Sequence, residues 1–161
     1  MLRFIWVKML SPLVRRPSLL QVAALPWRRR KGHLEILLVT SLDTGSWILP
    51  KGWPMGGRDA AGAAAEEAWE EAGVEARGLC AEPLGQYRYT KRLKGEVPMR
   101  CAVDVYPVEV ARLHDAYPES ARRRRRWMTR QEAAGAVSDR SLKQFLLTMP
   151  DLPEGGGQKI P

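Results

Sequence analysis

The apolar positions of the first third of the chain predict two paired strands. Segments 18–27 and 33–41 are short, apolar and partly β-branched, and the second is more uniformly apolar. The basic stretch 28–32 between them is expected to supply the turn. A third, shorter strand at 46–50 ends at a proline, and the Gly- and Pro-rich loop KGWPMGG follows it.

A helix is predicted after this loop. Asp59 can cap its first turn, and Gly73 stands where a left-handed residue commonly ends a helix, so the helix should run to about Ala72. One side of it carries small residues at helical spacing: Ala61, Ala65, Ala68 and Ala72. Methyl groups alone on that side would let the helix approach a sheet closely.

The second half of the chain predicts more strands and then helices. Segments 84–93 and 97–110 read as strands joined by a turn at Lys94-Gly95, and 122–129 reads as a last strand. Two terminal helices follow. The first opens with a T-x-x-E capping box, and the second places four apolar residues on one face: Leu142, Phe145, Leu146 and Met149.

This order of elements predicts an α+β or α/β sandwich with a mixed central sheet. The 161 residues fit a single domain. We expect a loosely ordered basic arm at 1–17, the folded domain at 18–149 and a disordered tail at 150–161.

Charge is distributed unevenly. The formal net charge is +8, no acidic residue precedes Glu35, and Arg122 to Arg126 form a second basic block. Such a balance favours a polyanionic partner: nucleic acid, an anionic membrane surface or a phosphate-rich small molecule.

No segment approaches the roughly 18 apolar residues that span a bilayer, and the first residues lack a signal-peptide cleavage site. Cys80 and Cys101 have no partners at metal-ligand spacing, so we expect reduced thiols in a cytoplasmic protein.

Four carboxylates crowd into the predicted helix. Glu66, Glu67, Glu70 and Glu71 lie within six residues, and no Lys or Arg occurs between Arg58 and Arg77. On a helix Glu67 neighbours both Glu70 and Glu71, and each like-charged pair costs about 0.2–0.5 kcal/mol. A solvated acidic face is one interpretation. A hard divalent cation such as Mg²⁺, which prefers carboxylate oxygens, is the other.

These residues carry a resemblance. The stretch from Gly52 to Val74 resembles the signature of the Nudix hydrolases, G-x5-E-x7-R-E-U-x-E-E-x-G-U, where U is a bulky aliphatic residue. The matching positions are Gly52, Glu67, Glu70, Glu71, Gly73 and Val74. The departing ones are Arg58 in place of Glu, Glu66 in place of Arg, and Ala68 in place of a larger aliphatic. We hypothesise that Arg58 and Glu66 pair with reversed polarity.

The resemblance implies an α/β/α sandwich that hydrolyses a nucleoside diphosphate linked to another moiety, or an analogous diphosphate. Glu67, Glu70 and Glu71 would be the catalytic carboxylates and would bind Mg²⁺, or Mn²⁺ in its place. The general base would be one of them or an outlying acid, for which the candidates are Asp104, Glu109 and Glu119. The sequences WILPKG and RRW are similar to those of the diphosphoinositol polyphosphate phosphohydrolase branch.

The expected substrate contacts are basic. Lys51 and the Gly52 backbone would contact phosphate at the mouth of the helix, and further cations are expected from Lys91, Arg92, Arg100 and one face of the arginine block, Arg126 included. Trp53, Tyr87 and Tyr89 could stack on a base, while Trp47 is expected in the core.

A diphosphoinositol or dinucleoside polyphosphate is the leading substrate, with nucleic acid not favoured as a partner. The alternatives are a pyrophosphatase of (d)NTPs or ADP-sugars, and a non-catalytic domain that binds nucleotide or RNA. The oligomeric state is left open.

Overall fold

The structure is a computed structural model that describes residues 18–92 and 94–154. It contains one mixed sheet and three helices within those residues. The elements, in chain order, are β1 (Leu19–Arg30), β2 (His33–Thr40), β3 (Trp47–Ile48), β4 (Lys51–Gly52), α2 (Ala60–Ala72), β5 (Val74–Leu79), β6 (Gly85–Lys91), β7 (Met99–Leu113), β8 (Arg125–Thr129), α3 (Arg130–Ala136) and α4 (Arg140–Thr148).

The sheet is organised around two long strands. β1 and β7 pair in parallel, and the other strand pairs of the described residues are antiparallel, which confirms the expected mixed sheet. β7 pairs with β6 along its first half and with β5 along its second. On the other side, β1 pairs with β4 through Val22 and Ala23, and with β2 beyond them. The short strand β4 is therefore fixed against the middle of the sheet.

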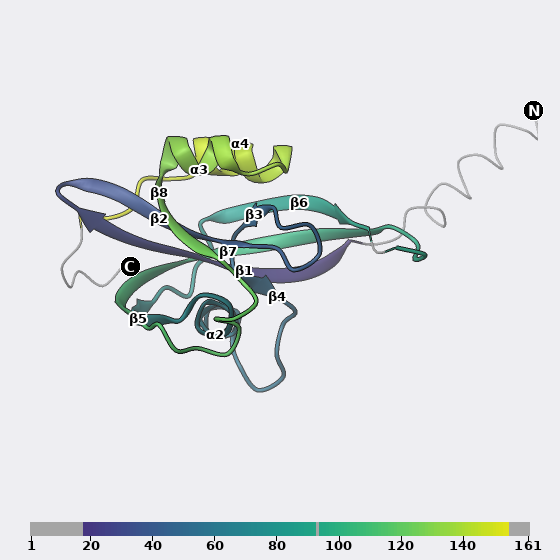
Figure 1. Cartoon of the computed structure of the whole chain (residues 1–161), viewed down its shortest axis with the longest axis horizontal. Coiled ribbons are helices and arrows are strands. Elements are labelled where there is room, and N and C mark those ends of the chain that lie inside the picture. The colour runs from purple at the N-terminus through teal and green to yellow at the C-terminus, as the bar shows by residue number, and fades with distance from the viewer. Residues whose placement is uncertain (1–17, 93, 155–161) are drawn as a thin grey trace, which may run out of the picture.

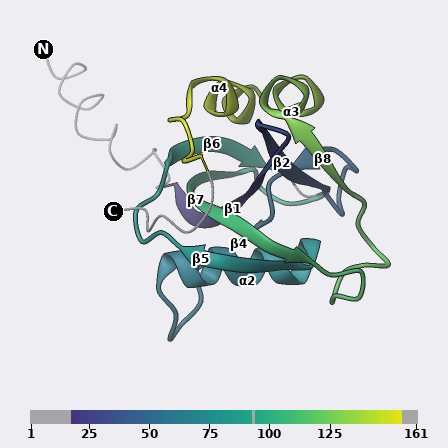
Figure 2. The same cartoon turned by 90° about the vertical axis from the view of Figure 1, so that its left-hand side faces the viewer.

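Helices cover both faces of the sheet. Figures 1 and 2 show α2 on one side and α3 with α4 on the other. Alternate residues of β2 point to the two sides: Leu37 and Val39 pack with the alanines of α2, whereas Ile36 and Leu38 pack with α3 and α4. The expected α/β/α sandwich is confirmed.

Several predicted boundaries shift. β1 continues through Arg30, so the turn is only Lys31-Gly32, with φ of 51° and 79°. A two-residue turn with positive φ at both positions matches the right-handed twist of a hairpin, which is why the basic residues before it stay in the strand. The sequence prediction also missed β4 and β5. The last strand starts at Arg125 rather than at residue 122.

The expected disorder of 150–161 does not hold for the first part of that segment. Leu152 is buried in the core beside α4, and the Arg29 side chain donates hydrogen bonds to the carbonyl oxygens of Leu152, at 2.7 Å, and Pro153, at 3.1 Å. An apolar side chain and two satisfied carbonyls hold this segment against the sheet. Residues 155–161 and the predicted arm 1–17 lie outside the described residues.

The helix caps follow the sequence signals. Asp59 accepts a hydrogen bond from the Gly62 amide, Gly73 has a φ of 69°, and Thr129 forms a complete capping box with Glu132. Cys80 and Cys101 are both free and buried; the expected cytoplasmic location stays a prediction. No described helix is long and apolar enough to cross a membrane.

Candidate active site

The alanine face of α2 brings this helix close to the sheet. Ala61, Ala64, Ala68 and Ala72 are buried against β1, β2 and β7. Ala65, which the sequence placed in this stripe, is only partly buried, and Ala64 takes its place. Because no bulky side chain separates the helix from the sheet, glutamates flanking the stripe are also drawn inward.

The four carboxylates of α2 lie in two environments. Glu67 is 9% exposed and Glu71 is 6% exposed, whereas Glu66 and Glu70 are partly exposed. A solvated acidic face therefore does not describe Glu67 and Glu71. Removing a carboxylate from water is costly unless a cation or hydrogen bonds compensate, so these two residues define the candidate site.

Gly52 leaves room for one of these carboxylates. A Cβ atom at this position would overlap the carboxyl group of Glu67, so any side chain at position 52 would displace it. The requirement for glycine here comes from this close approach, because Gly52 has no positive φ. The backbone of β4 and the side chain of Glu67 thus lie in direct contact, as expected for two residues of one site.

Burial changes the protonation of both inward glutamates. It raises the pKa of Glu67 from 4.5 to about 7, and the nearby charges of Glu70 and Glu119 add to this shift. Burial also raises the pKa of Glu71 from 4.5 to about 8, against the lowering effect of the Arg123 guanidinium. Near pH 7, in the absence of a bound cation, Glu71 is therefore mostly protonated and Glu67 about half protonated.

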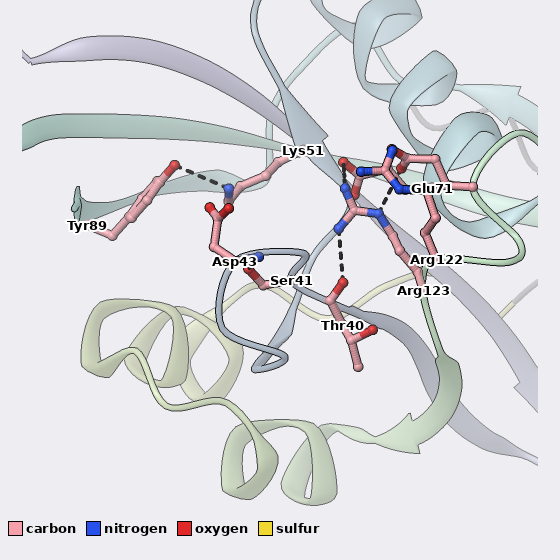
Figure 3. A network of polar contacts seen from close by, with 9 residues as sticks. Thr40, Ser41, Asp43, Lys51, Glu71, Tyr89, Arg122 and Arg123 are labelled. Atoms are coloured by element: carbon pink, nitrogen blue, oxygen red, sulfur yellow. Dashed lines mark hydrogen bonds and ion pairs between the residues drawn. The ribbon is translucent and has the colours of Figure 1, made fainter. Parts of the chain in front are cut away.

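Lys51 connects this pair to a neighbouring cavity. Its Nζ donates a hydrogen bond to the Tyr89 hydroxyl at 3.2 Å (Figure 3). That hydroxyl donates in turn to Gln21 Oε1 at 2.5 Å. Burial lowers the pKa of Lys51, while the charge of Glu71 opposes the change. Lys51 also acts electrostatically on Glu67. The Lys51 ammonium group therefore lies at the cavity and also acts electrostatically on the carboxylates.

The cavity has a volume of about 400 Å³ and lies between the β2–β3 loop, the end of β6 and the start of α4. Lys51, Lys91 and Arg92 line it together with Tyr87 and Tyr89. The other lining residues are Ser41, Asp43, Thr44, Ser46, Trp47, Ile48, Thr90, Ser138, Asp139 and Leu142. Glu67, Glu70 and Glu71 do not line it, so Lys51 is its link to the carboxylates.

Two predicted substrate residues do not reach this cavity. Arg100 is exposed on β7 opposite Thr90, and Arg126 is exposed on β8 opposite Leu38. Neither lines the cavity, because each side chain projects from its strand into solvent. Trp53 is 42% exposed beyond β4, with the Lys91 ammonium 5.8 Å from the centre of its ring. Trp47 packs against the core as expected and also borders the cavity.

Of the three outlying acids, one is joined to the site. Glu119 Oε2 accepts a hydrogen bond from Arg123 Nε at 2.7 Å, and Arg123 also contacts Glu71. Asp104 accepts instead from Gln86, and Glu109 pairs with Arg77. Sequence reasoning gave Glu119 no preference and did not single out Arg123, because a run of five arginines carries no signal for which one turns inward.

The hypothesis of a reversed ion pair is supported by the geometry. Arg58 Nη2 lies 3.4 Å from Glu66 Oε2, so the two departures from the signature compensate each other across the loop and the first turns of α2. The pair is partly exposed and contributes at most about 1 kcal/mol.

Comparison with known proteins assigns the chain to a family. Residues 18–146 match the NUDIX domain. The chain belongs to the Nudix family. It is 32% identical over 126 residues to the mitochondrial Nudix hydrolase 12 of Arabidopsis thaliana, covering 73% of this chain and 61% of that protein. The chain thus spans about three fifths of the length of this curated relative.

Solved structures share the fold. The Ap4A hydrolase of C. elegans, in a binary complex, superposes with a TM-score of 0.57 at 18% identity, covering 81% of this chain and 93% of that one. The NUDIX domain of Shewanella oneidensis NrtR, complexed with ADP ribose, gives a TM-score of 0.55 at 16% identity, covering 89% and 94%. At these identities the similarity concerns the fold alone.

Nudix proteins generally use divalent metal ions such as Mg²⁺, and the donor chemistry here fits one. Glu71 Oε2 is buried and has no hydrogen-bond partner among the described residues, and a buried carboxylate oxygen without a partner is rare. In residues 18–92 and 94–154, no three Asp, Glu, His or Cys side chains already converge as a metal site. A cation would therefore have to draw the glutamates together.

The raised pKa values predict a pH dependence of stability in the metal-free protein. Folded Glu67 and Glu71 bind protons more tightly than in the unfolded chain, so between about pH 4.5 and 8 the folded state holds more protons. The free energy of unfolding should therefore fall as pH rises through this window. Urea denaturation in EDTA from pH 5 to 8.5 measures it.

Glu71→Gln should flatten this decline, because the amide does not titrate. Glu66→Gln, on the same helix but paired with Arg58 at the surface, is the matched control and should leave the decline in place. A wild-type stability that is constant or increases over this range would contradict the assignment of protonated buried glutamates.

Proposed function

We propose that this chain is a Mg²⁺-dependent hydrolase of a phosphoanhydride bond in a nucleoside diphosphate linked to another group. The observation that carries the proposal is the position of Lys51, which lines the cavity and acts on the buried glutamates. A diphosphate in the cavity would be held by this ammonium group with its phosphorus atoms beside the carboxylates. The Gly52 amide, next in the chain, is a second candidate donor to phosphate.

Glu67, Glu70 and Glu71 are the residues that would hold the metal. When bound, Mg²⁺ neutralises phosphate charge and lowers the pKa of a coordinated water. The protein contributes the carboxylate oxygens, the glycine that leaves room for Glu67, and a Lys51 ammonium that is already largely desolvated. Positioning before the reaction lowers the barrier, because these groups do not have to reorganise during it.

The proton of the attacking water needs an acceptor. Glu67 is one candidate, because its carboxyl group lies against the Gly52 backbone at the mouth of α2. Glu119, joined to the site through Arg123, is the second candidate. Asp104 and Glu109 are engaged with Gln86 and Arg77, which leaves them without support for this role.

The cavity favours a nucleotide over a fully phosphorylated ring. Three cationic side chains line it, but so do the carboxylates of Asp43 and Asp139 and the hydroxyl groups of five Ser and Thr side chains. An inositol ring with phosphate on most positions would place anions against these carboxylates. A nucleoside offers N–H and O–H donors to carboxylates and hydroxyls, and its phosphate chain can extend toward Lys51.

We therefore favour a dinucleoside polyphosphate or another nucleoside diphosphate derivative over a diphosphoinositol polyphosphate. Among the solved structures that share the fold are an Ap4A hydrolase and a NUDIX domain complexed with ADP ribose, so the fold is compatible with such ligands. A domain that binds nucleotide without hydrolysing it is the rival from another class. The intact glutamates argue against that rival.

Glu70→Gln should abolish turnover and preserve the fold, because it removes a charge and keeps the shape of the side chain. Release of phosphate or nucleotide from Ap4A, ADP-ribose and a diphosphoinositol polyphosphate, with Mg²⁺ and with EDTA, is the measurement. Glu66→Gln is the matched control on the same helix and should keep most of the activity. Binding of a nucleotide that Mg²⁺ never converts to product would instead support the non-catalytic rival.

Changing Lys91 and Arg92 to alanine together should lower kcat/KM roughly tenfold, since both line the cavity and charged contacts to phosphate contribute more than neutral ones. The loss should shrink as salt rises. Arg100→Ala, on the same hairpin outside the cavity, should cost less. Equal losses from the double variant and from Arg100→Ala would mean that the cavity is not where the substrate binds.

A further inference from the structure

Arg123 occupies an unusual place among the five consecutive arginines. Its side chain is 8% exposed and its guanidinium contacts three separate elements. Nη2 donates to Glu71 Oε1 at 3.0 Å, Nε donates to Glu119 Oε2 at 2.7 Å, and Nη1 donates to the Thr40 carbonyl oxygen at 2.9 Å. Figure 3 shows the side chain between Glu71 on α2 and Thr40 at the end of β2.

The backbone around Arg123 is fixed as well. Arg124 exchanges hydrogen bonds with Thr40, since its amide donates to Thr40 Oγ1 at 2.9 Å and its carbonyl accepts from the Thr40 amide at 3.0 Å. The Glu119 amide donates to the Glu70 carbonyl oxygen at 3.0 Å. The segment between β7 and β8 is thus held over the last turn of α2, and the guanidinium cannot move away without breaking several contacts.

The neighbouring arginines do other things. Arg122 is 64% exposed and approaches Glu119 only at 3.7 Å. Arg124 lies over the Trp47 ring, and Arg125 donates to the carbonyl oxygens of Ala72 and His114. Only Arg123, among the arginines of this block, contacts a buried carboxylate of α2. Its role therefore does not follow from the net charge of the block.

The contact with Arg123 involves only one of the two carboxylate oxygens of Glu71. Oε1 accepts from Arg123, and Oε2 is buried without a partner among residues 18–92 and 94–154. A lysine ammonium lacks a planar set of donors. The guanidinium forms one bond to Glu71, and its bonds to Glu119 and to the Thr40 carbonyl oxygen fix its own position. It leaves one oxygen available to a hard cation and brings in Glu119 as a further carboxylate.

We propose that Arg123 is the positioning residue of the carboxylate site: its guanidinium orients Glu71 and Glu119 for a divalent cation without being a ligand itself. The inference rests on the proposed function, because it concerns the same site. Outer contacts that orient metal ligands commonly change metal affinity 10- to 100-fold when removed. Arg123 has the geometry of such a contact.

The test uses the full chain and Mn²⁺ as the probe. Mn²⁺ affinity, measured by electron paramagnetic resonance without any substrate, should weaken roughly 10-fold or more in Arg123→Gln and by a smaller factor in Arg123→Lys. Arg122→Gln is the matched control, since it removes an exposed arginine that approaches the same Glu119, and should stay within about twofold of wild type. In active protein, Arg123→Lys should lower kcat more than it raises KM.

Folding is checked by the cooperativity of urea denaturation in EDTA. If Arg123→Gln does not fold, Glu119→Gln removes the other end of the same contact and should weaken Mn²⁺ binding in its place. Unchanged or tighter Mn²⁺ binding in folded Arg123→Lys and Glu119→Gln would overturn the inference, and so would a rise in KM alone. A wild type that binds Mn²⁺ but hydrolyses no diphosphate would refute the proposed function and leave this inference standing, provided that the variants weaken binding.

Discussion

The burial of two glutamates on α2 is the constraint on which the rest of the site depends. A carboxylate loses hydration when it enters the protein, and Glu67 and Glu71 both do so beside one another. Each nearby feature lowers that cost. Gly52 gives Glu67 space, Lys51 supplies a positive charge from the cavity side, and Arg123 supplies another from the opposite side. The alanine face of the helix causes the burial, because it lets the helix settle onto the sheet.

Much of the fold could be predicted from the sequence because its signals are local. Asp59, Gly73 and the Thr129 capping box mark helix ends, and the uniformly apolar run within 33–41 marks a buried strand. What escaped prediction depends on contacts distant in the chain. β4 is two residues long and exists only because β1 passes beside it, and Leu152 becomes ordered only through Arg29 and the core.

The site shows the same division. Glu67, Glu70 and Glu71 stand out by their spacing on one helix, and so does Gly52 once the signature is recognised. Arg123 and Glu119 could not be assigned, because they reach Glu71 through a loop whose path the sequence does not specify. The charge of the chain was also a poor guide to the cavity. Asp43 and Asp139 offset its cations, while Arg100 and Arg126 lie outside it.

The central claim, that Glu67 and Glu71 form a cation site oriented by Arg123, is tested most directly by crystals grown with Mn²⁺ and measured for anomalous scattering. The account predicts a peak within bonding distance of Glu71 Oε2 and of a Glu67 oxygen, with Glu71 Oε1 still accepting from Arg123. Crystals containing millimolar Mn²⁺ that show no peak beside these glutamates, or a peak only at exposed acidic residues, would contradict it.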